Sequence, residues 1–128
     1  MKVKQEKTLN YSVGELSSQE IASLSEAPIN IILDDSTGTL SGHFTACGRV
    51  FLHFRFKGTF NRQVYREWRG AFLDVLDTFK TYGHEAVYSM IPISDEKSIK
   101  FNLSFGFMPY VEYKHPYHGF VWILKRSF

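Results

Sequence analysis

His53 is the one titratable side chain in the segment 50–56 with an ordinary pKa that suits a base near neutral pH. It lies in the segment 50–56, where Phe51, His53 and Arg55 alternate with apolar residues and so share one face of a strand. An imidazole ordinarily titrates between pH 5 and 8, where it can accept a proton from a nucleophile. The alternative is a structural histidine whose hydrogen bonds are satisfied inside a sheet. The sequence leaves both interpretations open.

Three arginines, Arg62, Arg66 and Arg69, are spaced by four and three residues, which places them on one ridge of a helix. They occupy its N-terminal half, and Asp74 and Asp77 follow them. Cations at a helix start oppose the macrodipole, at a cost of about 0.3–1 kcal/mol for a charge in the first turn. A bound anion such as a phosphate would compensate for this cost. A solvated polar face is the simpler alternative.

Metal chemistry and thiol chemistry are not expected. His115 and His118 flank a turn, but no convincing third ligand accompanies them, so no zinc site is predicted. Cys47 is the single cysteine, which excludes an internal disulfide and a cysteine-based zinc site. No partner base for a Cys47 nucleophile is identifiable, and we expect a small core or loop residue.

Length and charge limit the kind of protein. The chain has 128 residues, which predicts one domain spanning 1–128. Its net charge of +2 gives no global basic field that would attract nucleic acid. Residues 1–10 are mixed and charged, unlike a signal peptide, and no apolar run reaches the length of a membrane span. We therefore expect a soluble, cytoplasmic protein without membrane or nucleic-acid partners.

The helix that carries the arginines is the clearest predicted element. Apolar residues recur at helical spacing from 61 to 82, and Gly83 is typical of the residue just past a helix end. Apolar runs at 50–56 and 86–91 flank this helix, and a strand, a crossover helix and a second strand predict parallel pairing. We therefore expect an α/β domain, more exactly described as an α+β mixed sheet with packed helices. The other expected elements are a short capped helix at 17–24, strands at 29–33, 39–47, 108–113 and 119–125, a short helix from 95 to 105, a turn at 114–117, and an edge strand or arm at 1–10.

The segment 94–107 resembles the end of the GNAT family of N-acetyltransferases. Members often have an asparagine, a small residue three positions later, a helix with aromatic residues, and Gly-Phe at the start of a strand. Here Asp95 stands at the asparagine position, Ser98 at the small position, and Gly106-Phe107 matches directly. The element order is similar from the first helix onward, and short bacteriophage-encoded members are similar in character. The resemblance implies a central mixed sheet with the long helix between two parallel, splayed strands.

The same resemblance implies acetyl-CoA as the cofactor. Members bind its pyrophosphate with backbone N–H groups in the loop before the long helix, within a pattern of Gln or Arg, two residues, Gly, one residue, and Gly or Ala. One register begins at Gln63 and puts Arg66 at a position for a small residue, and the other keeps Gly58 but ends on Phe60. The expected cofactor-binding residues are Gly58, Arg62, Gln63, Arg66 and Asp95.

The catalytic positions also depart from the family. Members commonly place a tyrosine four residues before the Gly of Gly-Phe, as the acid that protonates the departing thiolate. Here that position is Asn102, which has no titratable proton near neutral pH. A glutamate is the usual general base, and the corresponding strand of this chain offers only His53. His53 and Asn102 are therefore the candidate catalytic residues.

Two functions follow, and we favour the first. It is the acetyl-CoA-dependent transfer of an acetyl group to an amine. The second is a GNAT-fold binding or structural protein without the chemistry, for instance a bacteriophage virion or assembly component, located in the virion. The C-terminal hairpin would then mediate homo-oligomerisation or a contact with a virion protein through its aromatic residues Tyr110, Tyr113, Tyr117 and Trp122.

Overall fold

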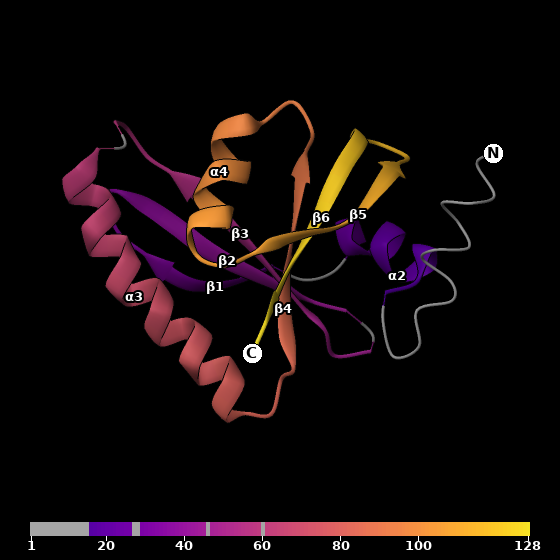
Figure 1. Ribbon diagram of the computed structural model, residues 1–128, viewed down its shortest axis with the longest axis horizontal. Helices are drawn as coiled ribbons and strands as arrows, with labels where there is room; N and C mark the ends of the chain where they lie inside the picture. The colour runs from indigo at the N-terminus through magenta and orange to yellow at the C-terminus, as the bar shows by residue number, and fades with distance from the viewer. Residues whose placement is uncertain (1–15, 27–28, 46, 60) are drawn as a thin grey trace.

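The structure is a computed structural model that describes residues 16–26, 29–45, 47–59 and 61–128. The described residues form a six-stranded mixed sheet with helices packed on both faces (Figure 1), as the sequence predicts. The elements in chain order are α2 (Ser18–Ala22), the 3-10 helix η1 (Ser23–Glu26), β1 (Ile29–Asp34), β2 (Gly38–Phe44), β3 (Val50–Phe56), α3 (Arg62–Thr81), β4 (Ala86–Pro92), α4 (Glu96–Ser104), β5 (Met108–His115) and β6 (Gly119–Ser127). The edge strand or arm expected at 1–10 lies outside the described residues.

The sheet is split at its centre. Its order is β1-β2-β3-β4-β6-β5, and all neighbouring strands are antiparallel except β3 and β4, which α3 connects. Phe51 and Tyr88 are the one described Cα pair between β3 and β4, whereas β4 pairs with β6 along its whole length. Figure 1 shows β3 and β4 diverging towards their C-terminal ends, with α4 over the opening. The predicted parallel, splayed pair is confirmed.

α3 begins and ends close to the predicted residues. The Asn61 side chain caps it by accepting the backbone N–H of Val64 at 2.9 Å. Gly83, with a φ of 94°, adopts the left-handed conformation past its C-terminus. Phe79 is only partly buried, and the stripe that packs against the sheet is Val64, Trp68, Phe72 and Leu76. No helix in the described part of the chain is long and apolar enough to span a membrane.

α2 and η1 cover the opposite face of the sheet. The buried apolar residues of this segment are Leu16, Ile21 and Leu24. Glu20 ties α2 to the turn between β2 and β3, because its carboxylate accepts hydrogen bonds from Arg49 Nη1 at 2.9 and 3.2 Å and from the Thr45 hydroxyl. Glu20 is buried, so the loss of Arg49 would leave an uncompensated charge at a cost of about 3–5 kcal/mol. The ion pair therefore fixes the segment that carries Leu24.

β2 ends at Phe44, whereas the sequence predicts a strand as far as residue 47. The reason is a turn, in which the backbone N–H of Thr45 donates to the Arg49 carbonyl at 2.9 Å. The Thr45 hydroxyl also accepts the Arg49 backbone N–H at 3.1 Å. These bonds satisfy the backbone groups that a longer strand would have paired.

β5 continues to His115, whereas the sequence predicts a turn at 114–117. His115 pairs with Gly119 in the β5–β6 hairpin, so the connecting turn is shorter than predicted. The His115 imidazole makes this possible, because its ring accepts backbone N–H groups of the turn. The side chain consequently lies inside the fold.

Candidate active site

Two hollows meet at the split between β3 and β4. The larger, about 400 Å³ in volume, is a groove on the face that α2 covers. The smaller, about 40 Å³, lies under α4 between the diverging strands. His53, Met90 and Pro92 line both hollows. A molecule held in the groove and a molecule held between the strands would therefore come together beside His53.

His53 is a neutral base at pH 7. Burial lowers its pKa below the ordinary value of 6.5, electrostatic repulsion from His43 and Arg55 lowers the pKa further, and Asp95 acts in the opposite direction. The side chain nevertheless keeps an exposed surface. His53 can therefore accept a proton from a bound molecule and pass that proton on to water.

His115 brings a fixed hydrogen-bond donor to the groove. Only 2% of its surface is exposed, and its Nδ1 accepts the backbone N–H groups of Tyr117 at 3.1 Å and His118 at 3.3 Å. A neutral imidazole carries one hydrogen, so Nε2 must hold it. Nε2 is buried and has no hydrogen-bond partner among the described residues. His115, which lines the groove, thus carries a buried N–H group that is fixed in direction and has no partner among the described residues.

His43 also lines the groove. It pairs with Phe51 across β2 and β3, which places both side chains on the groove face. Its Nδ1 is buried without a partner in the part of the chain that the structure describes. Sequence reasoning missed His43, because the alternation of one strand gives its faces but not its register against the next strand.

The histidines of the β5–β6 turn come together as a pair. The rings of His115 and His118 lie 4.6 Å apart between centroids, and both line the groove. Among the residues described, no three His, Cys, Asp or Glu side chains gather in a way that could hold a metal ion. Cys47 is exposed. The imidazoles among the described lining residues of the groove are those of His43, His53, His115 and His118.

Asn102 and Asp95 line the small hollow, where α4 positions both. Asn102 is 3% exposed, its Nδ2 donates to the Ser98 carbonyl at 2.8 Å, and its Oδ1 is buried with no partner among the described residues. Asp95 caps α4 by accepting the Ser98 backbone N–H at 3.2 Å and the Ser98 hydroxyl at 2.8 Å. Asn102 therefore offers a free acceptor, while the carboxylate of Asp95 is engaged as a cap.

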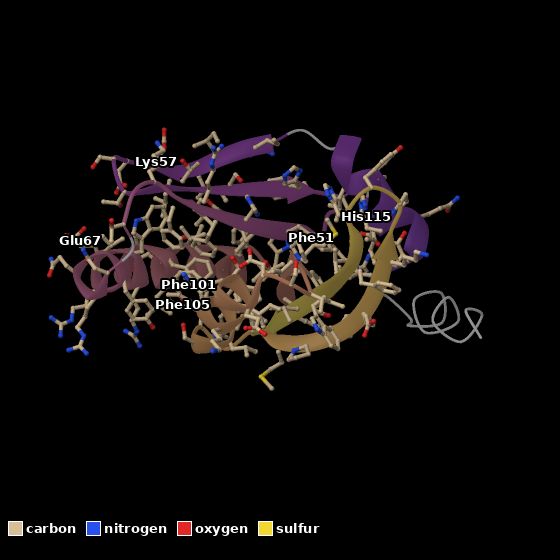
Figure 2. The ribbon with its side chains drawn as sticks, turned by 90° about the horizontal axis from the view of Figure 1, so that it is seen from above. Phe51, Lys57, Glu67, Phe101, Phe105 and His115 are labelled. Atoms are coloured by element: carbon tan, nitrogen blue, oxygen red, sulfur yellow. The ribbon has the colours of Figure 1, made fainter. Side chains whose placement is uncertain are left out.

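Aromatic rings fill most of the space between the diverging strands and α4. Phe101 contacts Phe54 and Phe56 edge-on, with ring centroids 4.9 and 5.1 Å apart. Figure 2 shows Phe101 and Phe105 on this side of the molecule, well apart from His115. These rings explain why the small hollow is narrow.

The remaining candidate cofactor residues lie at or just before the start of α3, outside both hollows. Arg62, Gln63 and Arg66 are exposed, and Gln63 Nε2 donates to Glu67 at 3.1 Å. Gly58 has a φ of 74°, and a side chain there would meet no atom within 4 Å. The space at this loop is open, but the structure does not bring these residues to His53.

A mixed sheet that splits between two parallel strands, with the connecting helix packed on one face, has the arrangement of the GNAT acetyltransferases. Neither a scan against protein-family models nor a search of curated proteins finds a match to this chain. Among solved structures, the chain is similar to one described as "Putative GnaT-family acetyltransferase from Bordetella pertussis", with a TM-score of 0.58 and 14% sequence identity over 97% of this chain and 86% of that chain. The predicted GNAT fold is thus confirmed, while the suggested bacteriophage origin gains no support.

Proposed function

We propose that the protein is an N-acetyltransferase that holds acetyl-CoA between β3 and β4 and an amine in the groove. The observation that carries this proposal is the meeting of the two hollows at His53, an imidazole that is neutral at pH 7. The fold is compatible with this activity, although a fold alone does not assign a function.

Residues at three places fit acetyl-CoA. β3 has no described β4 partner beyond Phe51, so its edge is open to a bound chain that carries amide groups. Asn102 Oδ1 offers an acceptor to an amide N–H. Arg62 and Arg66, near the open space at Gly58, offer cations to phosphates. The bound cofactor would supply an acetyl group as a thioester.

The rings of Phe56 and Phe101 are the obstacle to this fit. They lie in contact across the opening between β3 and α4, so they must separate to admit a ligand. Both side chains are only partly buried, which leaves them room to change rotamer. The proposal therefore includes a movement of these two rings on binding.

His53 receives the proton that an amine loses when it forms an amide. An aliphatic amine is largely protonated at pH 7, with a pKa of about 10.4 for a lysine side chain, and only the neutral form attacks a carbonyl. The ammonium would first lose one proton to water. As the nitrogen bonds to the acetyl carbon and the thioester C–S bond breaks, the nitrogen would become acidic and the neutral His53 imidazole would take its second proton. The exposed part of the side chain returns that proton to water. The departing thiolate would take its proton from water, because Asn102 has none to give.

Asn102 has no proton to give to a leaving group. An amide does not titrate near neutral pH, and Nδ2 already donates to the Ser98 carbonyl. We assign to Asn102 a hydrogen-bonding role through Oδ1. The position that is a tyrosine acid in many family members is therefore not an acid in this protein.

Calorimetric titration of acetyl-CoA into the purified protein tests the proposal. We expect binding that weakens with added salt, because phosphates meet arginines. A competition with desulfo-CoA, which keeps the phosphates and lacks the thiol, is the matched control and should also bind. A protein that binds neither molecule at millimolar concentration contradicts the proposal.

The second function, a GNAT-fold binding protein without chemistry, is favoured by the rings that close the space between β3 and α4. A partner would then meet the β5–β6 hairpin in a homo-oligomer or a virion. Tyr117 is exposed there as the sequence suggests, whereas Tyr110, Tyr113 and Trp122 are partly buried. Further exposed apolar side chains on these strands are Met108 and Phe120. The same titration separates the two functions.

A further inference from the structure

The lining of the groove excludes one large class of amines. Its walls are mainly apolar, with Leu24, Phe51 and Val121 among them, and none of the described lining residues is an aspartate or glutamate. A polyamine or another polycation needs carboxylates to replace its lost hydration. The groove therefore suits an amine with an apolar body.

At the end of the groove, His115 has a hydrogen-bond donor without an acceptor among the described residues. Nδ1 faces the turn and Nε2 lies on the other side of the ring, so the unpaired N–H points away from the turn backbone. His115 shares a face of β5 with Val111 and Tyr113, and these residues belong to the cluster on the groove side. Buried N–H groups in folded proteins are nearly always paired. Because Nε2 is itself buried, a ligand oxygen in the groove would pair this N–H once the side chains that cover it shift.

We propose that the substrate of the groove is a small apolar primary amine that carries a hydrogen-bond-accepting oxygen, a carboxylate or a carbonyl, which His115 Nε2–H binds. The apolar body lies against Phe51 and the amine lies at His53, where the groove meets the small hollow. The position of the amine rests on the proposed acetyl transfer. The position of the oxygen rests on the unpaired N–H of His115 and does not depend on that transfer.

A matched ligand series tests this assignment by binding alone, without acetyl-CoA. The probes are 4-(aminomethyl)benzoate, 4-(aminomethyl)benzamide and 4-methylbenzylamine, which keep the amine and the ring and change only the opposite end. Calorimetry gives their dissociation constants, and the imidazole signals of protein labelled with nitrogen-15 at histidine report which ring atoms respond. Spermidine is the polycation control.

We expect the benzoate or the benzamide to bind at least about tenfold more tightly than 4-methylbenzylamine, because one buried hydrogen bond is gained. The tighter of the two identifies the oxygen as a carboxylate or a carbonyl. The Nε2–H signal of His115 should shift with these two probes and not with spermidine. Equal affinity for all three benzylamines, or an unchanged His115 signal, overturns the proposal.

Two variants of His115 distinguish the role of Nε2–H in binding a ligand from the role of Nδ1 in holding the turn. His115→Asn keeps an acceptor near the Nδ1 position and removes the Nε2–H, so the preference for an oxygen should disappear. His115→Gln can place an amide N–H near the Nε2 position and should retain part of it. Should either variant fail to fold, the His115 signal in the unsubstituted protein still decides. If the groove prefers the oxygen-bearing probes but the protein does not bind acetyl-CoA, this inference is supported and acetyl transfer is refuted. If the protein binds acetyl-CoA but the groove shows no such preference, this inference is refuted and acetyl transfer is supported.

Discussion

The two sides of the split sheet differ in how completely side chains fill them. Under α4, Phe101 meets both Phe54 and Phe56 edge-on, which is a favourable arrangement for aromatic rings, and the remaining hollow is about 40 Å³. On the other side, a groove of about 400 Å³ is lined by His43 and His115, and each has one buried imidazole atom without a partner among the described residues. Ring packing stabilises the fold, whereas an unpaired buried polar atom costs stability unless a ligand pairs it. The comparison shows that aromatic packing closes most of the α4 side, whereas the groove is open to the ligand that we propose for it.

Replacing Phe72 by alanine is expected to give the largest effect. Phe72 is fully buried, with ring centroids 4.6 Å from both Phe54 and Phe105, so Phe72→Ala should lower the free energy of unfolding by about 3–5 kcal/mol. Chemical denaturation measures this loss. Phe120→Ala is the control, because Phe120 is 52% exposed and its loss should cost no more than about 0.5 kcal/mol. A cost below about 1 kcal/mol for Phe72→Ala would mean that the α4 side is not the core.

Phe101→Ala should lower the stability of the fold and at the same time ease the entry of acetyl-CoA between β3 and α4. Phe101 is partly buried, so we expect a smaller loss of about 2–3 kcal/mol in the free energy of unfolding. The same change opens the space between β3 and α4 and should tighten acetyl-CoA binding, because no ring has to move. Calorimetry measures the second effect. Weaker binding in this variant would show that the ring contacts the cofactor instead of blocking it.

Arg66→Ala should weaken acetyl-CoA binding by about 1.5–3 kcal/mol, the usual range for hydrogen bonds to charged groups. The salt dependence of binding should also become flatter. The free energy of unfolding should hold or rise slightly, since a cation that opposes the helix dipole is removed. Arg69→Ala is the matched control on the same ridge, further from the start of α3. Equal losses in both variants would indicate a diffuse positive field without a phosphate contact.

The imidazoles predict a modest loss of stability in acid. Burial lowers the pKa of both His53 and His115, with nearby positive charge adding to the effect. Between these lowered pKa values and the ordinary 6.5, the unfolded chain binds more protons than the folded one, so stability rises with pH in this window. The contribution of these two imidazoles to the free energy of unfolding is fully present above pH 6.5 and falls as the pH decreases below that value. Thermal unfolding near neutrality and at about pH 5.5 measures the difference, and His115→Asn should reduce it.

A midpoint of thermal unfolding that stays constant, or rises, from neutral pH to about pH 5.5 would contradict this assignment of pKa directions. The His115→Asn comparison guards against a contribution from other groups. If this variant keeps the full pH dependence, His115 is not one of its sources.

The sequence predicted the fold well because the signals for it are local. Helical periodicity placed α3, alternation placed Phe51 and His53 on one face of β3, and Asp95 was correctly expected at the start of α4. Each of these signals acts within a few residues of the chain. They sufficed to predict the parallel, splayed strands.

The candidate site was predicted only in part, because it depends on contacts between distant segments. His53 and Asn102 were identified in advance, but the groove joins His53 to His43 and His115 from other strands. The register of β2 against β3 brings His43 to the groove, and the turn that His115 closes brings His115 there. Neither feature follows from a local sequence pattern. The closure of the opening by Phe101 was likewise not predictable from its helical spacing, which indicates burial but not the partner.

The central claim is that acetyl transfer takes place beside His53. The most direct test compares the protein with its His53→Gln variant in transferring an acetyl group from acetyl-CoA to 4-(aminomethyl)benzoate and 4-(aminomethyl)benzamide, with the dissociation constant of acetyl-CoA measured for both. The account predicts that kcat falls by about 10²–10⁴-fold in the variant while acetyl-CoA binds equally well, because His53 takes the proton and does not hold the cofactor. An unchanged kcat in His53→Gln, or no transfer by an unsubstituted protein that binds both molecules, would contradict it.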